Sequence, residues 1–268
     1  MMLLPGKEPV CASKKRSGGG KRLIALLLVL AILLGGCVWY LETYYHADLP
    51  AITAFSEGAG AEENRMEDGS LTFGRGDESF GLIFYPGGKV EHTAYVPLMR
   101  ELAGRGVFCV LCEMPFRLAV LDPKAADGIP ETFPEVRHWY LGGHSLGGVM
   151  AADYLDDHPE VFEGLILLAS YTEADLSDSD LRVLSLYGSE DRVLNRDRYE
   201  EAGDNLPKDT REIVIPGGCH AYFGMYGAQR GDGIPTISAA EQIRFTAETI
   251  RSWLAETEEG GGALAQGD

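Results

Sequence analysis

The chain has 268 residues, of which 45% are hydrophobic and 24% are charged, and its formal net charge is −18. This length allows one large α/β domain with an anchor and is too short for two ordinary catalytic domains. The charge is uneven, because residues 1–22 hold six basic residues and one acidic residue, and the remainder carries −23. Nucleic-acid binding needs a basic footprint, so the acidic body excludes nucleic acid as a partner.

Residues 23–41 form a run of 19 residues without a charge. As a helix this run would measure about 28 Å, close to the hydrocarbon thickness of a bilayer. The basic residues precede it, so the positive-inside rule predicts that residues 1–22 form a basic cytoplasmic leader. The sequence thus predicts a single-pass transmembrane anchor at 23–41, with the rest of the chain extracytoplasmic. Aromatic residues suited to the outer membrane interface come next: Trp39, Tyr40, Tyr44 and Tyr45.

A second interpretation of this region is a cleaved signal peptide. Leu34-Gly35-Gly36-Cys37 resembles a bacterial lipoprotein cleavage box, and cleavage there would leave Cys37 lipidated. Apolar residues continue for four positions beyond Cys37, which favours the uncleaved anchor. Both interpretations tether the domain outside the cytoplasm, with the membrane as its partner.

Residues 42–70 are expected to be a linker and entry segment, since the stretch 56–70 is rich in Gly, Glu and Ala and has no apolar period. In residues 71–257, short apolar runs alternate with helix-like stretches. The predicted strands are Leu82–Tyr85, Val107–Glu113, Trp139–Leu141, Leu165–Ala169, Val183–Tyr187 and Glu212–Ile215. The predicted helices are Glu91–Ala103, Leu146–Asp156, Arg196–Ala202 and Ala239–Glu256.

Near-continuous apolar strands are typical of a parallel sheet that is covered on both faces. Their alternation with helices predicts an α/β domain with a doubly wound, mostly parallel sheet. The Gly-rich tail, residues 258–268, has little apolar content and is expected to be disordered.

Ser145 stands at the centre of Gly143-His144-Ser145-Leu146-Gly147, a G-x-S-x-G sequence. The pattern alone is weak, but here a predicted strand precedes it and a predicted helix follows it, as a nucleophile on a sharp turn requires. The flanking glycines allow the tight turn, and the helix N-terminus stabilises developing negative charge. We interpret Ser145 as a nucleophile; a Gly-rich turn without chemistry is the alternative.

A serine nucleophile needs a base to take its proton, and the base needs an acid to hold its ring. Asp191 lies in the loop after the predicted strand Val183–Tyr187, and Glu190 is the alternative acid beside it. His220 lies in the Gly-rich loop after the last predicted strand. The sequence therefore predicts a catalytic triad of Ser145, Asp191 and His220.

A serine hydrolase also needs two backbone donors for the oxyanion that forms on the substrate. One is expected to be the N–H of Leu146, directly after the nucleophile. The other should come from the loop after the predicted strand Leu82–Tyr85, where Gly88 is the first choice and Lys89 the second.

These segments, GHSLGG around Ser145, YGSEDRV around Asp191 and GGCHAYFGMYG around His220, resemble the α/β-hydrolase superfamily. They are similar in particular to its small bacterial membrane-anchored members with a YPGGKV-type oxyanion loop. The resemblance covers about residues 40 to 256. One departure is Pro86-Gly87, where the superfamily often has His-Gly. The resemblance implies an esterase-like activity on carboxylic esters, but no particular substrate, because one fold serves many chemistries.

Residues 170–181, between two predicted strands, are too few for a large cap domain. We therefore expect an open site for small or medium acyl esters. The apolar stretch 114–121 could line the pocket or pack in the core. Thioesterase, acyltransferase and peptidase chemistry would use the same triad, and a catalytically silent surface binding module is the alternative from another class.

No cofactor and no metal site is expected, since the sequence shows no metal-ligand cluster and no phosphate-binding loop. Cys109 and Cys112 have a C-x-x-C spacing but lie in an apolar strand, so we predict buried core thiols there. Cys219, beside His220, is likewise expected to serve in packing.

Overall fold

The computed structural model describes residues 19–56 and 62–264 of the chain. The chain divides into two units, Met1–Thr43 and Tyr44–Asp268. The first unit contains helix α1 (Gly19–Glu42), whose segment Arg22–Glu42 has a mean hydropathy of 2.6. This helix is long and apolar enough to span a bilayer, a property that signal sequences share.

The second unit is built on an eight-stranded sheet with the order β1-β2-β4-β3-β5-β6-β7-β8. Its strands are β1 (Glu63–Arg65), β2 (Leu71–Phe73), β3 (Phe80–Tyr85), β4 (Val107–Leu111), β5 (His138–His144), β6 (Gly164–Leu168), β7 (Arg182–Gly188) and β8 (Thr210–Ile215). Strands β3 to β8 pair in parallel, whereas β1 and β2 add an antiparallel edge. Every residue of β3, β4 and β6 is buried, as expected when both faces of a parallel sheet are covered.

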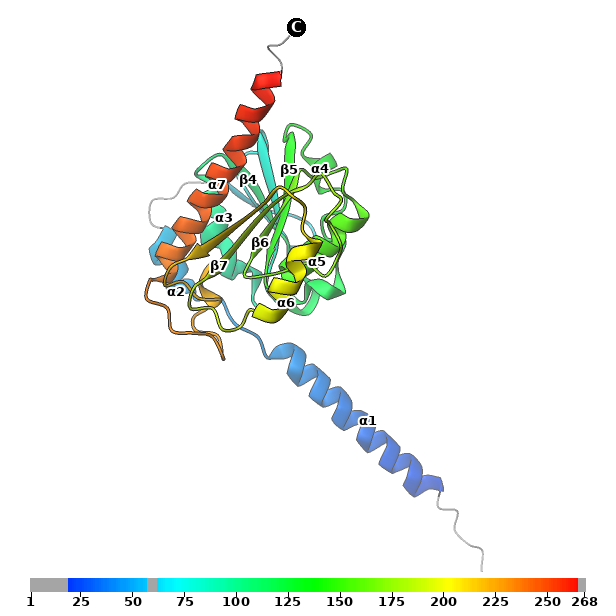
Figure 1. Ribbon diagram of the computed structural model, residues 1–268. Helices are drawn as coiled ribbons and strands as arrows, with labels where there is room; N and C mark the ends of the chain where they lie inside the picture. The colour runs from blue at the N-terminus through cyan, green and yellow to red at the C-terminus, as the bar shows by residue number, and fades with distance from the viewer. Residues whose placement is uncertain (1–18, 57–61, 265–268) are drawn as a thin grey trace, which may run out of the picture. The chain divides into compact units, whose positions relative to one another are not determined.

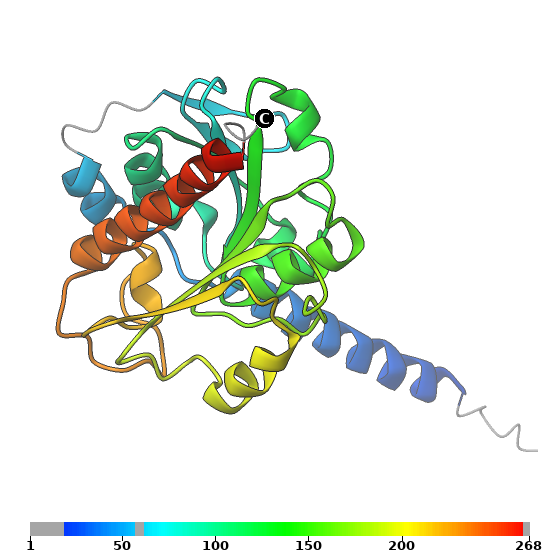
Figure 2. The same cartoon turned by 45° about the horizontal axis from the view of Figure 1, so that its top comes forward.

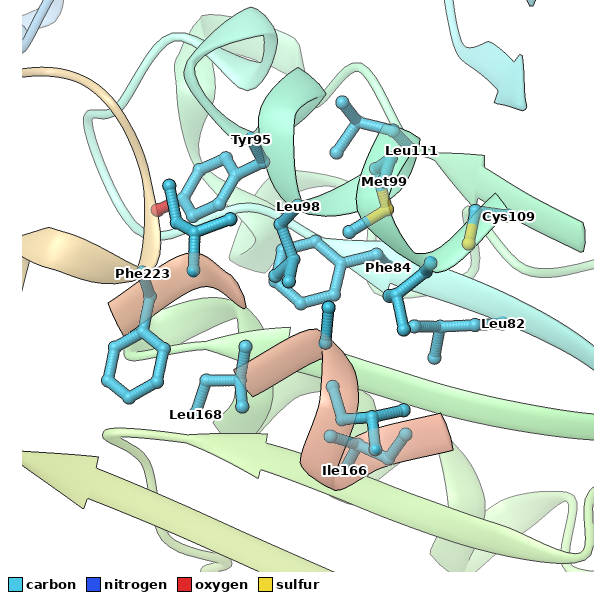
Figure 3. Packing of buried hydrophobic residues seen from close by; sticks show 14 of the residues in the cluster. Leu82, Phe84, Tyr95, Leu98, Met99, Cys109, Leu111, Ile166, Leu168 and Phe223 are labelled. Atoms are coloured by element: carbon cyan, nitrogen blue, oxygen red, sulfur yellow. The ribbon is translucent and has the colours of Figure 1, made fainter. Parts of the chain in front are cut away.

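Helices cover both faces of this sheet (Figures 1 and 2). Helices α3 (Val96–Ala103) and α7 (Ala239–Leu264) lie on one face, and α5 (Leu146–Asp157) lies on the other. Figure 3 shows part of the cluster under α3, where Leu98 packs close to Phe84 of β3. The α7 residues buried in the same cluster recur at helical spacing: Ile243, Ala247, Ile250 and Leu254. The predicted doubly wound α/β architecture is therefore confirmed.

Short helices complete the second unit: α2 (Leu49–Ser56), α4 (Ile129–Thr132) and α6 (Arg196–Glu201). Single turns of 3₁₀ helix are formed by His92–Tyr95, Pro115–Arg117, Ala119–Leu121, Ala202–Asn205 and Ala221–Phe223. Residues 169–181, between β6 and β7, form neither helix nor strand. The expectation that no large cap is inserted there is confirmed.

Two predicted segments contain secondary structure that the sequence did not indicate. The segment 42–70 is not simply a linker, because it contains α2 and β1, the side chain of Ile52 is buried, and the second unit begins at Tyr44 rather than at residue 71. These elements are short, and the three residues of β1 are exposed, so the sequence has no apolar periodicity from which they could be predicted. Helix α7 continues into the tail as far as Leu264. Residues 1–18 of the leader and 265–268 of the tail lie outside the described residues.

Candidate active site

Ser145 is the single residue between the end of β5 and the start of α5. Its backbone has φ 52° and ψ −123°, a conformation that is strained for a residue with a side chain. Two hydrogen bonds hold this turn: the Ser145 N–H donates to the Leu168 carbonyl at 3.0 Å, and the Ser170 hydroxyl donates to the Ser145 carbonyl at 2.7 Å. The structure thus places a half-buried serine on a sharp strand-to-helix turn, as predicted.

The two glycines of the G-x-S-x-G sequence are required by close backbone approach. A Cβ at Gly147 would lie 2.2 Å from the Tyr85 carbonyl oxygen and 2.4 Å from that of Pro86. A Cβ at Gly143 would lie 2.4 Å from the Gly147 carbonyl carbon. Because these obstacles are backbone atoms, no side-chain rotation can relieve them.

Replacing Gly147 with alanine is therefore expected to lower the free energy of unfolding by about 3 kcal/mol. The measurement is urea unfolding of the full chain in detergent micelles. Gly203→Ala is the matched control, since Gly203 is exposed and a Cβ there meets nothing within 4 Å. A similar loss of stability in both variants would contradict the tight packing at the turn.

Asp191 and His220, which are far apart in sequence, meet at the carboxyl edge of the sheet. His220 Nδ1 lies 2.9 Å from Asp191 Oδ2, and both side chains are 1% exposed. The other carboxylate oxygen, Oδ1, accepts hydrogen bonds from the N–H groups of Val193 at 2.9 Å and Leu194 at 2.8 Å. The carboxylate is therefore fixed, and its Oδ2 accepts a hydrogen bond from the N–H at Nδ1. Glu190, the alternative acid, instead accepts a hydrogen bond from the Ser189 hydroxyl at 3.0 Å.

The second ring nitrogen of His220, Nε2, is buried and has no hydrogen-bond partner among the residues that the structure describes. Leaving a buried polar atom unpaired costs about 1–3 kcal/mol, and almost all such atoms in folded proteins are paired. The His220 ring lies 4.6 Å, between centroids, from the ring of His144, the residue that directly precedes Ser145. An unpaired acceptor thus lies beside the strained turn.

The buried side chain of His144 links the loops of the site. Its Nε2 lies 3.1 Å from the His220 carbonyl oxygen, which can only accept, so Nε2 carries the proton. Its Nδ1 lies 2.7 Å from the Tyr95 hydroxyl and accepts from it. That hydroxyl in turn accepts a hydrogen bond from the Gly87 N–H at 3.1 Å. His144 therefore connects the loop after β3, the turn at Ser145 and the loop that carries His220.

Burial, and after it the nearby His220, lower the pKa of His144 well below its ordinary value. The unfolded chain takes up a proton on this residue near pH 6.5, whereas the folded protein does not. Stability is therefore expected to fall as the pH drops below about 6.5, by up to about 1.4 kcal/mol per pH unit from this group. His144→Gln should remove this contribution, so the stability difference between the two proteins should shrink from pH 7.5 to 4.5. A constant difference, measured by urea unfolding, would contradict the neutral buried form.

The loop after β3 supplies the candidate oxyanion donors. The Lys89 N–H already donates to the Arg117 carbonyl at 2.7 Å, and the Gly87 N–H is bonded to Tyr95. Gly88 lies against the turn, because a Cβ there would be 2.9 Å from Leu146 Cδ2. The N–H of Leu146 belongs to the first turn of α5, where no intrahelical acceptor exists. This geometry favours Gly88 over Lys89 as the partner of Leu146.

Three residues that position the site were missed in the sequence: Tyr95, Asp232 and Gln242. Buried Gln242 bonds both backbone groups of Cys219, accepting from its N–H at 3.0 Å and donating to its carbonyl at 2.8 Å. Asp232 accepts from the Ala221 N–H at 2.9 Å, so it holds the other side of His220. Gln242 could have been found as a polar residue on the apolar face of a predicted helix. Tyr95 and Asp232 carry no such signal.

The predictions for the cysteines are confirmed. Cys109, Cys112 and Cys219 are buried and free. Burial raises the pKa of the Cys219 thiol to about 12 and that of Cys109 well above its ordinary value. These thiols therefore stay protonated and serve in packing.

Comparison with known proteins gives matches along most of the chain. Residues 81–244 match the model of the alpha/beta hydrolase family. A curated relative, the uncharacterized protein Cgl0967/cg1104 of Corynebacterium glutamicum, is 24% identical over 147 residues, which make up 52% of this chain. The match spans 33% of that relative, so the chain corresponds to about a third of its length.

Solved structures share the fold at low identity. A membrane phospholipase A, described as a bacterial virulence factor, has a TM-score of 0.56 and 15% identity, covering 89% of this chain and 99% of its own. The esterase Rv0045c of Mycobacterium tuberculosis has a TM-score of 0.57 and 12% identity, covering 76% and 96%. Est1E of Butyrivibrio proteoclasticus has a TM-score of 0.53 and 14% identity, covering 74% and 98%. With the family model matching more than half of its residues, the chain belongs to the alpha/beta hydrolase family.

Proposed function

We propose that this protein is a membrane-anchored serine hydrolase that cleaves carboxylic esters. The observation that carries the proposal is the hydrogen bonding of the two ring nitrogens of His220. Its Nδ1 is held by the Asp191 carboxylate at 2.9 Å, while its buried Nε2 has no partner among the described residues. A histidine oriented in this way has a free lone pair on Nε2, as a general base needs, and its ring lies next to His144, the residue before Ser145.

The proposed reaction uses these residues as follows. His220 Nε2 takes the proton of Ser145 Oγ as that oxygen attacks the ester carbonyl carbon. The N–H groups of Leu146 and Gly88 stabilise the negative oxygen of the tetrahedral intermediate. His220 then gives its proton to the leaving alcohol, and an acyl group remains on Ser145. Water then attacks the acyl carbonyl carbon as His220 takes its proton, and His220 passes that proton to Ser145 Oγ when the acid is released.

The proposed substrates are esters with small or medium acyl groups. No cap is inserted between β6 and β7, where a lid over the site would be placed. An open site of this kind offers little enclosed apolar surface for a long acyl chain. The solved structures that share the fold include proteins described as esterases and as a phospholipase, which fits an ester substrate.

The direct test uses the full chain in detergent micelles. We expect a fluorophosphonate probe to label the protein, and p-nitrophenyl acetate and butyrate to be hydrolysed faster than the palmitate ester. If the probe does not label the protein and no ester is hydrolysed, a catalytically silent binding module would be favoured instead.

We also propose that the catalytic unit lies outside the cytoplasm. The leader carries +5 over 22 residues, and cationic segments resist translocation, so it should stay inside while residues 23–41 span the membrane. Protease added to spheroplasts is expected to digest the catalytic unit and to spare a tag fused before Met1. Protection of the catalytic unit would show an inverted orientation. A mature chain that begins at Cys37 would show a lipoprotein instead.

A further inference from the structure

The segment that leaves the N-terminal helix is bonded to the proposed oxyanion loop. The Tyr45 N–H donates to the Lys89 carbonyl at 2.8 Å, and the Glu91 N–H donates to the Tyr45 carbonyl at 2.9 Å. These two bonds pair Tyr45 with Val90 in a parallel bridge. The second unit therefore begins within the loop region that supplies Gly88 to the site.

Chain length limits how far this loop can lie from the membrane. Helix α1 ends at Glu42, three residues before Tyr45. Three residues span at most about 10 Å when fully extended, whatever direction the helix takes. If Cys37 were the lipidated first residue, eight residues would allow at most about 28 Å. In either case the tether holds the oxyanion loop, and Ser145 with it, close to the membrane surface.

The apolar surface of the catalytic unit gathers at the same place. Beyond α1, the large apolar side chains that are exposed among the described residues are Leu49, Phe116, Val120, Leu121, Val214, Ile234 and Phe245. Two of them lie apart from the others, Val214 on β8 and Phe245 on α7. The other five lie on segments that contact the loops of the site.

The segment 115–121 lies against the proposed oxyanion loop. The Arg117 carbonyl accepts the Lys89 N–H, and the Arg117 guanidinium lies 3.6 Å from the centre of the Tyr44 ring. Phe116 and Arg117 both have a positive φ, 52° and 60°, which is a costly conformation for two consecutive residues with side chains. Phe116, Val120 and Leu121 are nevertheless 52–53% exposed to water. A strained turn that exposes apolar side chains to solvent is typical of a surface that contacts an apolar partner.

Two further exposed residues flank the site. Ile234 is 86% exposed, and its neighbour Gly233 lies so close to the loop of Asp191 that a Cβ there would be 1.8 Å from the Glu190 carbonyl oxygen. Leu49 is 62% exposed at the start of α2, where the Asp48 N–H donates to the Met225 carbonyl at 2.8 Å. The exposed apolar side chains thus lie next to the site both near Tyr45, where the second unit begins, and near the loop that carries Asp191.

We propose that this edge of the sheet faces the bilayer that holds the N-terminal helix, and that the substrate is an acyl ester carried in that bilayer. This inference rests on the proposed function. The acidic body disfavours contact through charge with anionic lipids, so the contact is apolar and the lipid surface can be neutral. An uncapped site suits an ester group at the interface, because the acyl chain can remain in the bilayer until the bond is cleaved.

Fluorescence quenching in phosphatidylcholine vesicles tests the orientation with the full chain. In a Cys11→Ser, Cys37→Ser background, a bimane label is attached at Leu121→Cys, at Ile234→Cys or at Lys208→Cys. Lys208 is the control because it is exposed and precedes β8, at the opposite edge of the sheet. We expect nitroxide-labelled phosphatidylcholine to quench the labels at 121 and 234 at least threefold more than the label at 208. Equal quenching, or stronger quenching at 208, would overturn the proposed orientation.

The substrate is tested by lengthening the tether with a twenty-residue Gly/Ser insertion between Thr43 and Tyr44, which adds a spacer of about 25 Å. Hydrolysis of 1,2-dioctanoylglycerol carried in the vesicles should fall at least fivefold, while hydrolysis of p-nitrophenyl acetate in water stays within twofold. Unchanged rates on both esters would refute the membrane-carried substrate. Fluorophosphonate labelling of the same vesicles separates the two proposals. If the probe labels the protein but the three bimane labels are quenched equally, only the proposed membrane orientation is contradicted. If quenching is selective but the probe does not label the protein, only the proposed function is contradicted.

Discussion

Replacing Ser145 with alanine is expected to lower kcat for p-nitrophenyl butyrate by about 10⁴- to 10⁶-fold and to abolish fluorophosphonate labelling. The hydroxyl oxygen is the proposed nucleophile, and no other group at this position can form the acyl intermediate. The variant should still fold, because the bonds that hold the turn use only the backbone of Ser145: its N–H donates to Leu168, and its carbonyl accepts from Ser170.

The matched control is Ser252→Ala, since Ser252 is exposed on α7, remote in sequence from the loops of the site. Its kcat should stay within twofold of the wild-type value. A well-folded Ser145→Ala protein that keeps more than a tenth of the activity would rule out Ser145 as the nucleophile. Circular dichroism and urea unfolding, measured on both variants, show whether each has kept its fold.

Asp191→Asn should lower kcat by about 10⁴-fold while leaving the fold intact. The Val193 and Leu194 N–H groups both donate to Oδ1, so the amide oxygen of the asparagine must take that place. Its NH₂ group then faces His220 Nδ1 and donates to it, where the carboxylate had accepted. The proton of the neutral ring is forced onto Nε2, and that nitrogen can no longer accept the proton of Ser145.

Glu190→Gln is the control for this prediction, because Glu190 is the neighbouring acid and is bonded to Ser189 instead of the base. Its activity should remain within about threefold of the wild-type value. A large loss in Glu190→Gln together with a small loss in Asp191→Asn would reverse the assignment of the acid. Asp191→Glu offers a second check, since it keeps the charge but displaces it by one methylene group.

The sequence by itself determined the local parts of this protein. The uncharged run 23–41 predicts a helix long enough to span a bilayer, and the structure forms helix α1 over these residues. The apolar runs around Leu82 and Leu165 became buried parallel strands, since their residues suit both covered faces. The glycines around Ser145 predicted a tight turn. The structure gives the reason, because the backbone at the end of β3 lies too close to Gly147 for a side chain at that position.

Other features depend on contacts between residues that are distant in sequence, and only the tertiary structure decided them. The exposed strand β1 is held by backbone pairing with β2, which leaves no apolar period to detect. Gly88 is favoured over Lys89 as the proposed oxyanion donor because the Lys89 N–H is hydrogen-bonded to the carbonyl of Arg117, 28 positions further along the chain. The link from His144 to Tyr95 and His220 exists only because three loops meet at one edge of the sheet. The bond between Tyr45 and Lys89 is of the same kind, since backbone groups pair without regard to side-chain identity, and it joins the start of the second unit to the loop after β3.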